Sequence, residues 1–217
     1  MSDRMTRPIA ACLATLLSLL LPLAAVAAEP AVTPVEGVHY ERVDTPGTFQ
    51  PVKPGEVEVV EIFAYTCHHC ADFAPLIEAW KARQPKDVRV RYTPAGYDPT
   101  DTLSRGFFAA QRLGALPRTH LPTFRALHDE RTLPMNPSDD ELAAYYAGLG
   151  VDARQFRAAL DGPDVVRDMQ AARAFAMRVG LQGTPTLVVG GKWRVRGDSW
   201  ESLLRNAAAL VAHPPAD

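Results

Sequence analysis

The stretch VEVVEIFAYTCHHCADF, residues 57–73, contains the features that decide the fold of this chain. Residues 57–65 are mostly β-branched or aromatic, which predicts a central β-strand. Apolar residues then recur at the spacing of one helix face, at Phe73, Leu76, Ile77 and Trp80. Cys67 and Cys70 therefore lie where a strand meets an amphipathic helix, at or just inside the helix N-terminus.

This position at a helix N-terminus favours reactive cysteines. Only the thiolate form of cysteine attacks a disulfide, and a helix N-terminus, with unpaired N–H groups and roughly half a positive charge, favours a thiolate at Cys67. We expect the more exposed Cys67 to be the nucleophile and the less accessible Cys70 to resolve the mixed disulfide. Imidazole groups at His68 and His69 would stabilise the thiolate, and hence the reduced form, so the disulfide would be a strong oxidant.

Two other interpretations of the motif are weaker. A structural disulfide that closes so short a loop stabilises little, and a chain of 217 residues can build a core without one. Structural zinc takes four ligands, of which a C-x-x-C motif supplies only half. His120 and His128 are about 12 Å apart if they lie on one helix, too far to share an ion easily. We therefore expect no metal site.

Residues 1–28 have the pattern of a cleaved secretory signal peptide. Two arginines precede an apolar stretch at residues 9–21, and small residues at 25–28 offer cleavage sites. An uncleaved membrane anchor is the alternative, but the apolar run is short for a span. Cys12 would be removed with this segment, which leaves the two cysteines of the motif in a compartment where disulfides persist.

The remaining pattern predicts one sheet interrupted by helices. The expected elements are, in order, an edge strand at 38–43, the strand and helix already described, a strand at 88–92, helices near 100–114, 119–130, 138–146, from 151 and at 163–179, a hairpin with strands at 186–189 and 193–195, and a helix from 198 to about 211. Ser138 and Glu141 have the spacing of a capping box. Such an order indicates a single sheet with an inserted helical domain.

Two segments carry a resemblance to a known family: EIFAYTCHHC at residues 61–70 and GTPTLVVGGK at residues 183–192. With their long separation, they make the sequence resemble the DsbA family of periplasmic thiol–disulfide oxidoreductases over about residues 38–211. The resemblance implies an α/β protein, a thioredoxin fold with an inserted all-helical domain. The expected divisions are a signal peptide at 1–28, a tether at 29–37, a thioredoxin-like domain at 38–96 and 183–212, and the inserted helical domain at 97–182.

The resemblance also implies roles for residues outside the motif. Pro185 would be cis and lie beside the cysteines, while Thr184, with Gly183 before it, would pair with a bound substrate peptide. Glu61 matches a buried acidic residue that assists proton transfer at the buried cysteine; the alternative is an ordinary glutamate that faces solvent. Arg91 matches a position where relatives often have lysine near that glutamate; the alternative is an exposed strand arginine.

We therefore predict a periplasmic oxidase that introduces disulfide bonds into newly exported, unfolded proteins by exchange at the redox-active Cys67–Cys70 disulfide. The resemblance implies reoxidation by a DsbB-like, quinone-linked membrane oxidase. We expect a monomer without a cofactor. The formal net charge of −2 gives no indication of a nucleic-acid partner.

Two rival functions remain open. The dipeptide His68-His69 replaces the Pro-His that is best known in the family, and Thr184 replaces the valine frequent in strong oxidases, so a reductase or isomerase on the same fold is possible. An isomerase of the DsbC kind needs an N-terminal dimerisation domain, for which residues 29–55 are too short. The other rival is a redox-silent peptide-binding chaperone, which would keep its activity after Cys67→Ser.

Overall fold

The computed structural model describes residues 32–216. The signal peptide predicted at residues 1–28, with Cys12, lies outside the described residues. Within residues 32–216 no helix is both long enough and apolar enough to cross a membrane.

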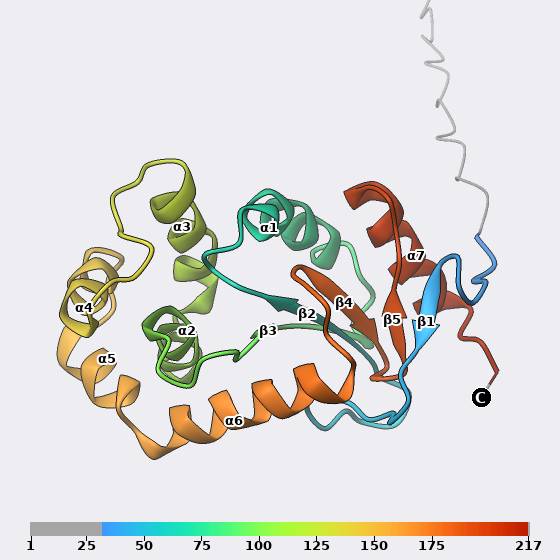
Figure 1. The fold of residues 1–217 in the computed structure, drawn as a ribbon, viewed down its shortest axis with the longest axis horizontal. Helices are drawn as coiled ribbons and strands as arrows, with labels where there is room; N and C mark the ends of the chain where they lie inside the picture. Colours follow the sequence, from blue (N-terminus) through green and yellow to red (C-terminus); the bar gives the residue numbers. More distant parts are fainter. Residues whose placement is uncertain (1–31, 217) are drawn as a thin grey trace, which may run out of the picture. The chain divides into compact units, whose positions relative to one another are not determined.

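A five-stranded mixed sheet organises the described chain (Figure 1). Its strands are β1 Tyr40–Arg42, β2 Val57–Phe63, β3 Val88–Pro94, β4 Thr186–Val189 and β5 Trp193–Val195. They lie in the order β1-β5-β4-β2-β3. Only β2 and β3 pair in parallel; the other neighbours are antiparallel. The predictions of a central β2, an edge strand β1 and a β4–β5 hairpin are confirmed.

Seven helices accompany the sheet in the described chain: α1 His68–Lys81, α2 Thr102–Arg112, α3 Leu116–His128, α4 Asp139–Gly148, α5 Ala153–Leu160, α6 Pro163–Arg178 and α7 Trp200–Ala212. Helices α2 to α6 follow one another between β3 and β4, as predicted. The capping box of Ser138 and Glu141 opens α4, because each side chain binds the backbone N–H of the other.

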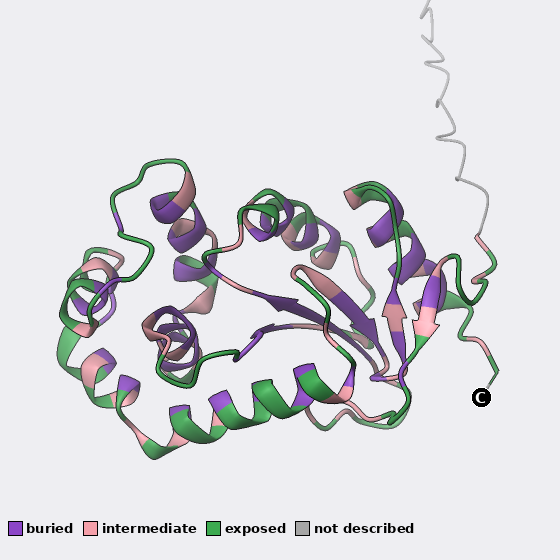
Figure 2. Cartoon of the chain, viewed as in Figure 1, coloured by how far each residue is buried: buried purple, intermediate pink, exposed green. Residues whose placement is uncertain are grey.

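The side chains of β2 alternate between two cores. Val59 and Phe63 belong to the cluster that contains residues of α1, α2, α3 and α7. Val60 and Ile62 belong to a second cluster with Phe175 of α6. Figure 1 accordingly shows α1 and α7 on one face of the sheet and α6 along the other, and Figure 2 shows β2 buried along almost its whole length. Successive strand residues point to opposite faces, so Glu61 shares the α1 face with Val59 and Phe63.

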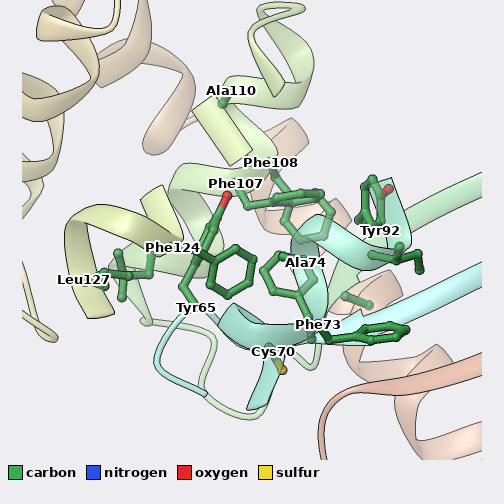
Figure 3. Close-up of a cluster of buried hydrophobic side chains, with 14 of the residues drawn as sticks. Tyr65, Cys70, Phe73, Ala74, Tyr92, Phe107, Phe108, Ala110, Phe124 and Leu127 are labelled. Atoms are coloured by element: carbon green, nitrogen blue, oxygen red, sulfur yellow. The ribbon is translucent and has the colours of Figure 1, made fainter. Parts of the chain in front are cut away.

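Aromatic side chains of α2 and α3 pack against the end of β2 (Figure 3). The ring centroid of Phe63 lies 5.2 Å from that of Phe107 on α2 and 5.7 Å from that of Phe124 on α3, both edge to face. Burial of each such side chain stabilises the fold by roughly 1.5–3 kcal/mol, and edge-to-face pairs add to this. This packing fixes the end of β2, from which the segment with the cysteine motif continues.

Candidate functional site

Cys67 begins helix α1 as its N-cap residue. Its backbone is extended, and its Sγ accepts a hydrogen bond of 3.3 Å from the N–H of Cys70. The first turn of α1 carries no acidic side chain that would offset the positive helix end. Both cysteines are free thiols, Cys67 half-buried and Cys70 buried. The predicted difference in accessibility is therefore present.

Burial raises the pKa of the Cys70 thiol well above its ordinary value, and the hydrogen bond to Cys67 raises it further. Cys70 is thus a neutral thiol near pH 7. A buried sulfur of this kind takes up a proton readily when it leaves a disulfide, which distinguishes it chemically from the partly exposed sulfur at the helix terminus.

The loop before β4 lies against the Cys67 sulfur. The Thr184–Pro185 peptide bond is cis, as the resemblance implies. The Cys67 thiol donates a hydrogen bond of 3.3 Å to the Thr184 carbonyl oxygen. The Thr186 hydroxyl donates to the Gly183 carbonyl oxygen at 2.8 Å and closes this loop on itself. Gly183 is exposed and Thr184 and Pro185 are half-buried, so the loop edge next to the sulfur is open to a polypeptide.

The two histidines of the motif are exposed. The His68 imidazole lies 3.5 Å from the Asp72 carboxylate, and its side chain is 73% exposed. The His69 ring centroid is 6.1 Å from the indole of Trp200 on α7. Among the hydrogen bonds of residues 32–216, none joins either imidazole to a cysteine sulfur. Any influence of these histidines on the thiolate therefore acts through space, and the predicted tuning role stays a prediction.

Glu61 is 1% exposed, so the alternative of a solvent-facing glutamate is wrong. Neither of its carboxylate oxygens has a hydrogen-bond partner in the described chain. Burial raises the pKa of Glu61 to about 8, with further contributions from the negative charges of Glu78 and Cys67, while the positive charge of Lys81 opposes them. Glu61 can therefore exchange a proton near neutral pH.

Arg91 is not near Glu61, contrary to the position inferred from the resemblance. It is the register partner of Val60, so its side chain points to the opposite face of the sheet. Its Nε lies 3.0 Å from Oε1 of Glu58. Glu58 is fully buried and also accepts hydrogen bonds from the N–H groups of Phe49 and Gln50 at 2.7 and 3.0 Å. The cation that acts on Glu61 is instead Lys81 of α1.

Sequence reasoning missed the residues that hold the segment before Cys67. The Tyr65 hydroxyl lies 3.0 Å from Nδ1 of His120, and Nε2 of His128 donates to the Tyr65 carbonyl oxygen at 2.7 Å. Burial lowers the pKa of His120 to about 3, so this imidazole is neutral. Two histidines eight positions apart face the same side of a helix, and this spacing was the available signal.

A cavity of about 430 Å³ opens beside Thr66, the residue before Cys67. It lies between the loops that follow β3 and α3, and its exposed rim includes Tyr97 and Met135.

A thiol held at a helix terminus beside a loop edge that a polypeptide can reach, with a buried carboxyl whose pKa responds to that thiol, suits dithiol–disulfide exchange. On this sheet and helix order, such a site defines a thiol–disulfide oxidoreductase of the thioredoxin fold. Comparison with known proteins shows to which family of thiol–disulfide oxidoreductases the chain belongs.

A family model described as a DSBA-like thioredoxin domain matches residues 97–208, which include the Thr184–Pro185 loop. The thiol:disulfide interchange protein DsbA of Azotobacter vinelandii is 32% identical over 158 residues, 72% of this chain and 73% of that protein. The protein of the same name from Burkholderia cepacia is 32% identical over 199 residues, 90% of this chain and 91% of its own. The crystal structure of oxidoreductase DsbA from Xylella fastidiosa superposes with a TM-score of 0.80 at 43% identity, covering 83% of this chain and 97% of that one. The chain belongs to the DsbA family of thiol:disulfide interchange proteins.

Proposed function

We propose that Cys67 and Cys70 are the redox pair with which this protein introduces disulfide bonds into exported proteins in the periplasm, after removal of residues 1–28. The observation that carries the proposal is the position of the Cys67 sulfur. It caps helix α1, is half-buried, and lies 3.3 Å from the Thr184 carbonyl oxygen on an accessible loop.

The reaction begins with the Cys67–Cys70 disulfide. A substrate thiolate attacks the Cys67 sulfur, the bond between the cysteines breaks, and its electron pair passes to Cys70. Because Cys70 is buried, its thiolate is unfavourable and takes up a proton at once. Glu61, as a carboxylic acid, supplies that proton and becomes a carboxylate.

The mixed disulfide lies along the loop of Gly183, Thr184 and Pro185, where the Thr184 main chain pairs with the substrate. A second substrate thiol loses its proton and attacks the substrate sulfur of the mixed disulfide. Cys67 then leaves as a thiolate, which the N–H of Cys70 and the positive end of α1 stabilise. The substrate has lost two electrons and the enzyme is a dithiol.

The histidines His68 and His69 favour the Cys67 thiolate through their positive charge when they are protonated. A more stable thiolate means a more stable reduced enzyme and hence a more oxidising disulfide. Asp72 offsets a charge on His68, so His69 has the larger effect.

The enzyme acts as a monomer and carries no cofactor of its own. Its electrons pass to a DsbB-like, quinone-linked membrane oxidase. Membership of the DsbA family, whose resemblance implies both, supports this partner and the periplasmic location.

The direction of exchange is tested by the reduction potential of the cysteine pair in glutathione buffers at pH 7. We expect a value near −120 mV, in the range of strongly oxidising DsbA proteins. A value near −270 mV, the range of thioredoxin, would overturn the oxidase assignment and make the protein a reductase. Thr184 beside Cys67 is the feature that favours this second candidate.

A further inference from the structure

Glu61 and Tyr92 form a pair of buried polar side chains without hydrogen-bond partners. They are register partners on β2 and β3, so both stand on the α1 face of the sheet. Glu61 is 1% and Tyr92 is 6% exposed. Neither the carboxylate oxygens nor the phenol oxygen forms a hydrogen bond in the part of the chain described. Both groups therefore lie on the face of the sheet that α1 covers, where charged side chains of α1 can act on them.

An ion pair on the last turns of α1 covers this buried pair. Nζ of Lys81 lies 4.5 Å from the centroid of the Tyr92 ring and 3.6 Å from Oε1 of Glu78. The side chains of Lys81 and Glu78 are 40% and 32% exposed. The two charges therefore lie between solvent and the buried groups, where they are only partly screened.

The two charges act on Glu61 in opposite directions. Glu78 and Cys67 favour the protonated carboxylic acid, and Lys81 favours the carboxylate. Glu78 is the larger of these charge effects, after burial itself.

Within residues 32–216, three neighbouring side chains on the other elements are uncharged. Tyr92 on β3 stays protonated, because burial and the neighbouring carboxylates raise its pKa. His120 on α3 stacks on the Tyr92 ring, with 4.9 Å between centroids, and is neutral. On β4 the register partner of Glu61 is the apolar Leu187. The charges that influence the protonation of Glu61 are therefore those of Glu78 and Lys81 on α1 and that of the Cys67 sulfur.

We propose that Glu78 and Lys81 are positioning residues for disulfide exchange: two opposed charges at the C-terminal end of α1 that set the protonation of Glu61, and through it proton transfer at Cys70. The proposal rests on the proposed function, in which Glu61 serves Cys70. Neither charge belongs to the cysteine motif, and both lie at the far end of the helix that the motif begins.

The proton balance shows where the two charges act. When the Cys67–Cys70 bond breaks, its electron pair goes to the Cys70 sulfur and the proton of Glu61 follows it. The carboxylate that remains is stabilised by Lys81 and destabilised by Glu78, and it regains a proton from solvent. Removal of one charge should therefore move the titration of Glu61 in the opposite direction to removal of the other.

Two variants of the purified, reduced protein test this. Lys81→Met removes the positive charge and keeps an apolar stem over the Tyr92 ring, and Glu78→Gln keeps the shape of its carboxylate. The readout is the pH titration of the Glu61 carboxyl carbon by NMR with ¹³C-labelled glutamate, assigned with Glu61→Gln. We expect the midpoint to rise by roughly 0.5–1 pH unit in Lys81→Met and to fall by a larger amount in Glu78→Gln. The pH profile of exchange with a dithiol peptide should move in the same directions.

The matched control is Lys86→Met, at an exposed lysine that follows α1, and we expect its titration midpoint to equal that of the unaltered protein. If Lys81→Met does not fold, Lys81→Gln replaces it. Midpoints that move in the same direction in both test variants, or that move no further than in Lys86→Met, would overturn the proposal. In that case, exchange that still depends on Cys67 leaves the proposed function intact, whereas exchange that survives Cys67→Ser overturns the proposed function itself.

Discussion

The Cys67 thiol donates a hydrogen bond of 3.3 Å to the carbonyl oxygen of Thr184, 117 positions further along the chain. The sheet explains this proximity. Strand β4 pairs antiparallel with β2, with Ile62 opposite Thr186, so the residues before β4 lie beside the end of β2, where the cysteine motif begins. The N-terminus of α1 and the loop before β4 thus meet at the Cys67 sulfur. Helices α2 to α6, which separate them in the sequence, take no part in this contact.

The two cysteines should respond differently to substitution. Cys67→Ser should abolish disulfide exchange with a reduced peptide, because the accessible nucleophile is lost. Cys70→Ser cannot form the internal disulfide and should also fail to oxidise a reduced peptide. With oxidised glutathione as the oxidant, its Cys67 should accumulate as a mixed disulfide with glutathione, because no Cys70 thiol remains to displace the glutathione, and mass spectrometry would detect this adduct. If the unaltered protein and Cys67→Ser protect an unfolding protein from aggregation equally well, and neither exchanges disulfides, the protein would instead be a chaperone.

Glu61→Gln should stabilise the protein at alkaline pH. The pKa of Glu61 is raised to about 8 from roughly 4.3 in the unfolded chain, so the folded state binds the extra proton and loses stability as the pH rises between these values. A tenfold difference in proton affinity between the folded and unfolded states corresponds to about 1.4 kcal/mol, and we expect a gain on the order of 3 kcal/mol at pH 9 after structural relaxation. Urea unfolding at pH 5 and pH 9 measures it.

The matched control for this change is Glu130→Gln, at an exposed position. It should leave the pH dependence of unfolding unaltered. Equal behaviour of the two variants would mean that Glu61 is not protonated in the folded protein. The same Glu61→Gln variant should exchange disulfides more slowly, because Cys70 loses its proton donor.

Arg91→Met should destabilise the fold without slowing disulfide exchange. The substitution leaves the buried Glu58 carboxylate with only its backbone partners, at a cost of about 1–3 kcal/mol given that Arg91 is partly exposed. Because Arg91 faces away from Glu61, the pH profile of exchange should not move. The control is Arg89→Met, which removes an exposed partner of Glu56 and should lower the free energy of unfolding less than Arg91→Met does. A change in exchange rate in Arg91→Met would contradict this assignment of faces.

His128→Ala should loosen the segment before Cys67. It removes the donor to the Tyr65 carbonyl oxygen, which we expect to cost about 1–2 kcal/mol in the free energy of unfolding. His128→Gln places an amide N–H near the position of Nε2 and should recover much of the loss. Urea unfolding and exchange rates of both variants provide the measurement, and equal values for alanine and glutamine would argue against the hydrogen bond.

His69→Ala should make the cysteine pair less oxidising, by about 20 mV, because an exposed imidazole stabilises the thiolate only weakly. His68→Ala should change the reduction potential less, since Asp72 already offsets its charge. Glutathione equilibration at pH 7 measures both variants. A larger effect from His68 would reverse this order and assign the tuning role to that residue.

Local patterns in the sequence predicted most of the fold. The β-branched and aromatic content of residues 57–65, the apolar spacing after Cys67 and the capping box at Ser138 each depend on only a few neighbouring residues, so they are visible without the rest of the chain. The motif at a helix terminus followed from two such neighbouring patterns. Positions that depend on pairing across the sheet, such as that of Arg91, did not follow from them.

By itself, the sequence determined the order of elements, the helix that Cys67 begins and the difference in exposure between the two cysteines, because periodicity and capping are local properties. Only the tertiary structure decided which charges meet. Strand register separates Arg91 from Glu61, and packing of α1 over β3 brings Lys81 to Tyr92. Packing of α3 against β2 brings its histidines to Tyr65. These contacts join segments far apart in the chain, where burial and register, rather than local propensity, select the partners.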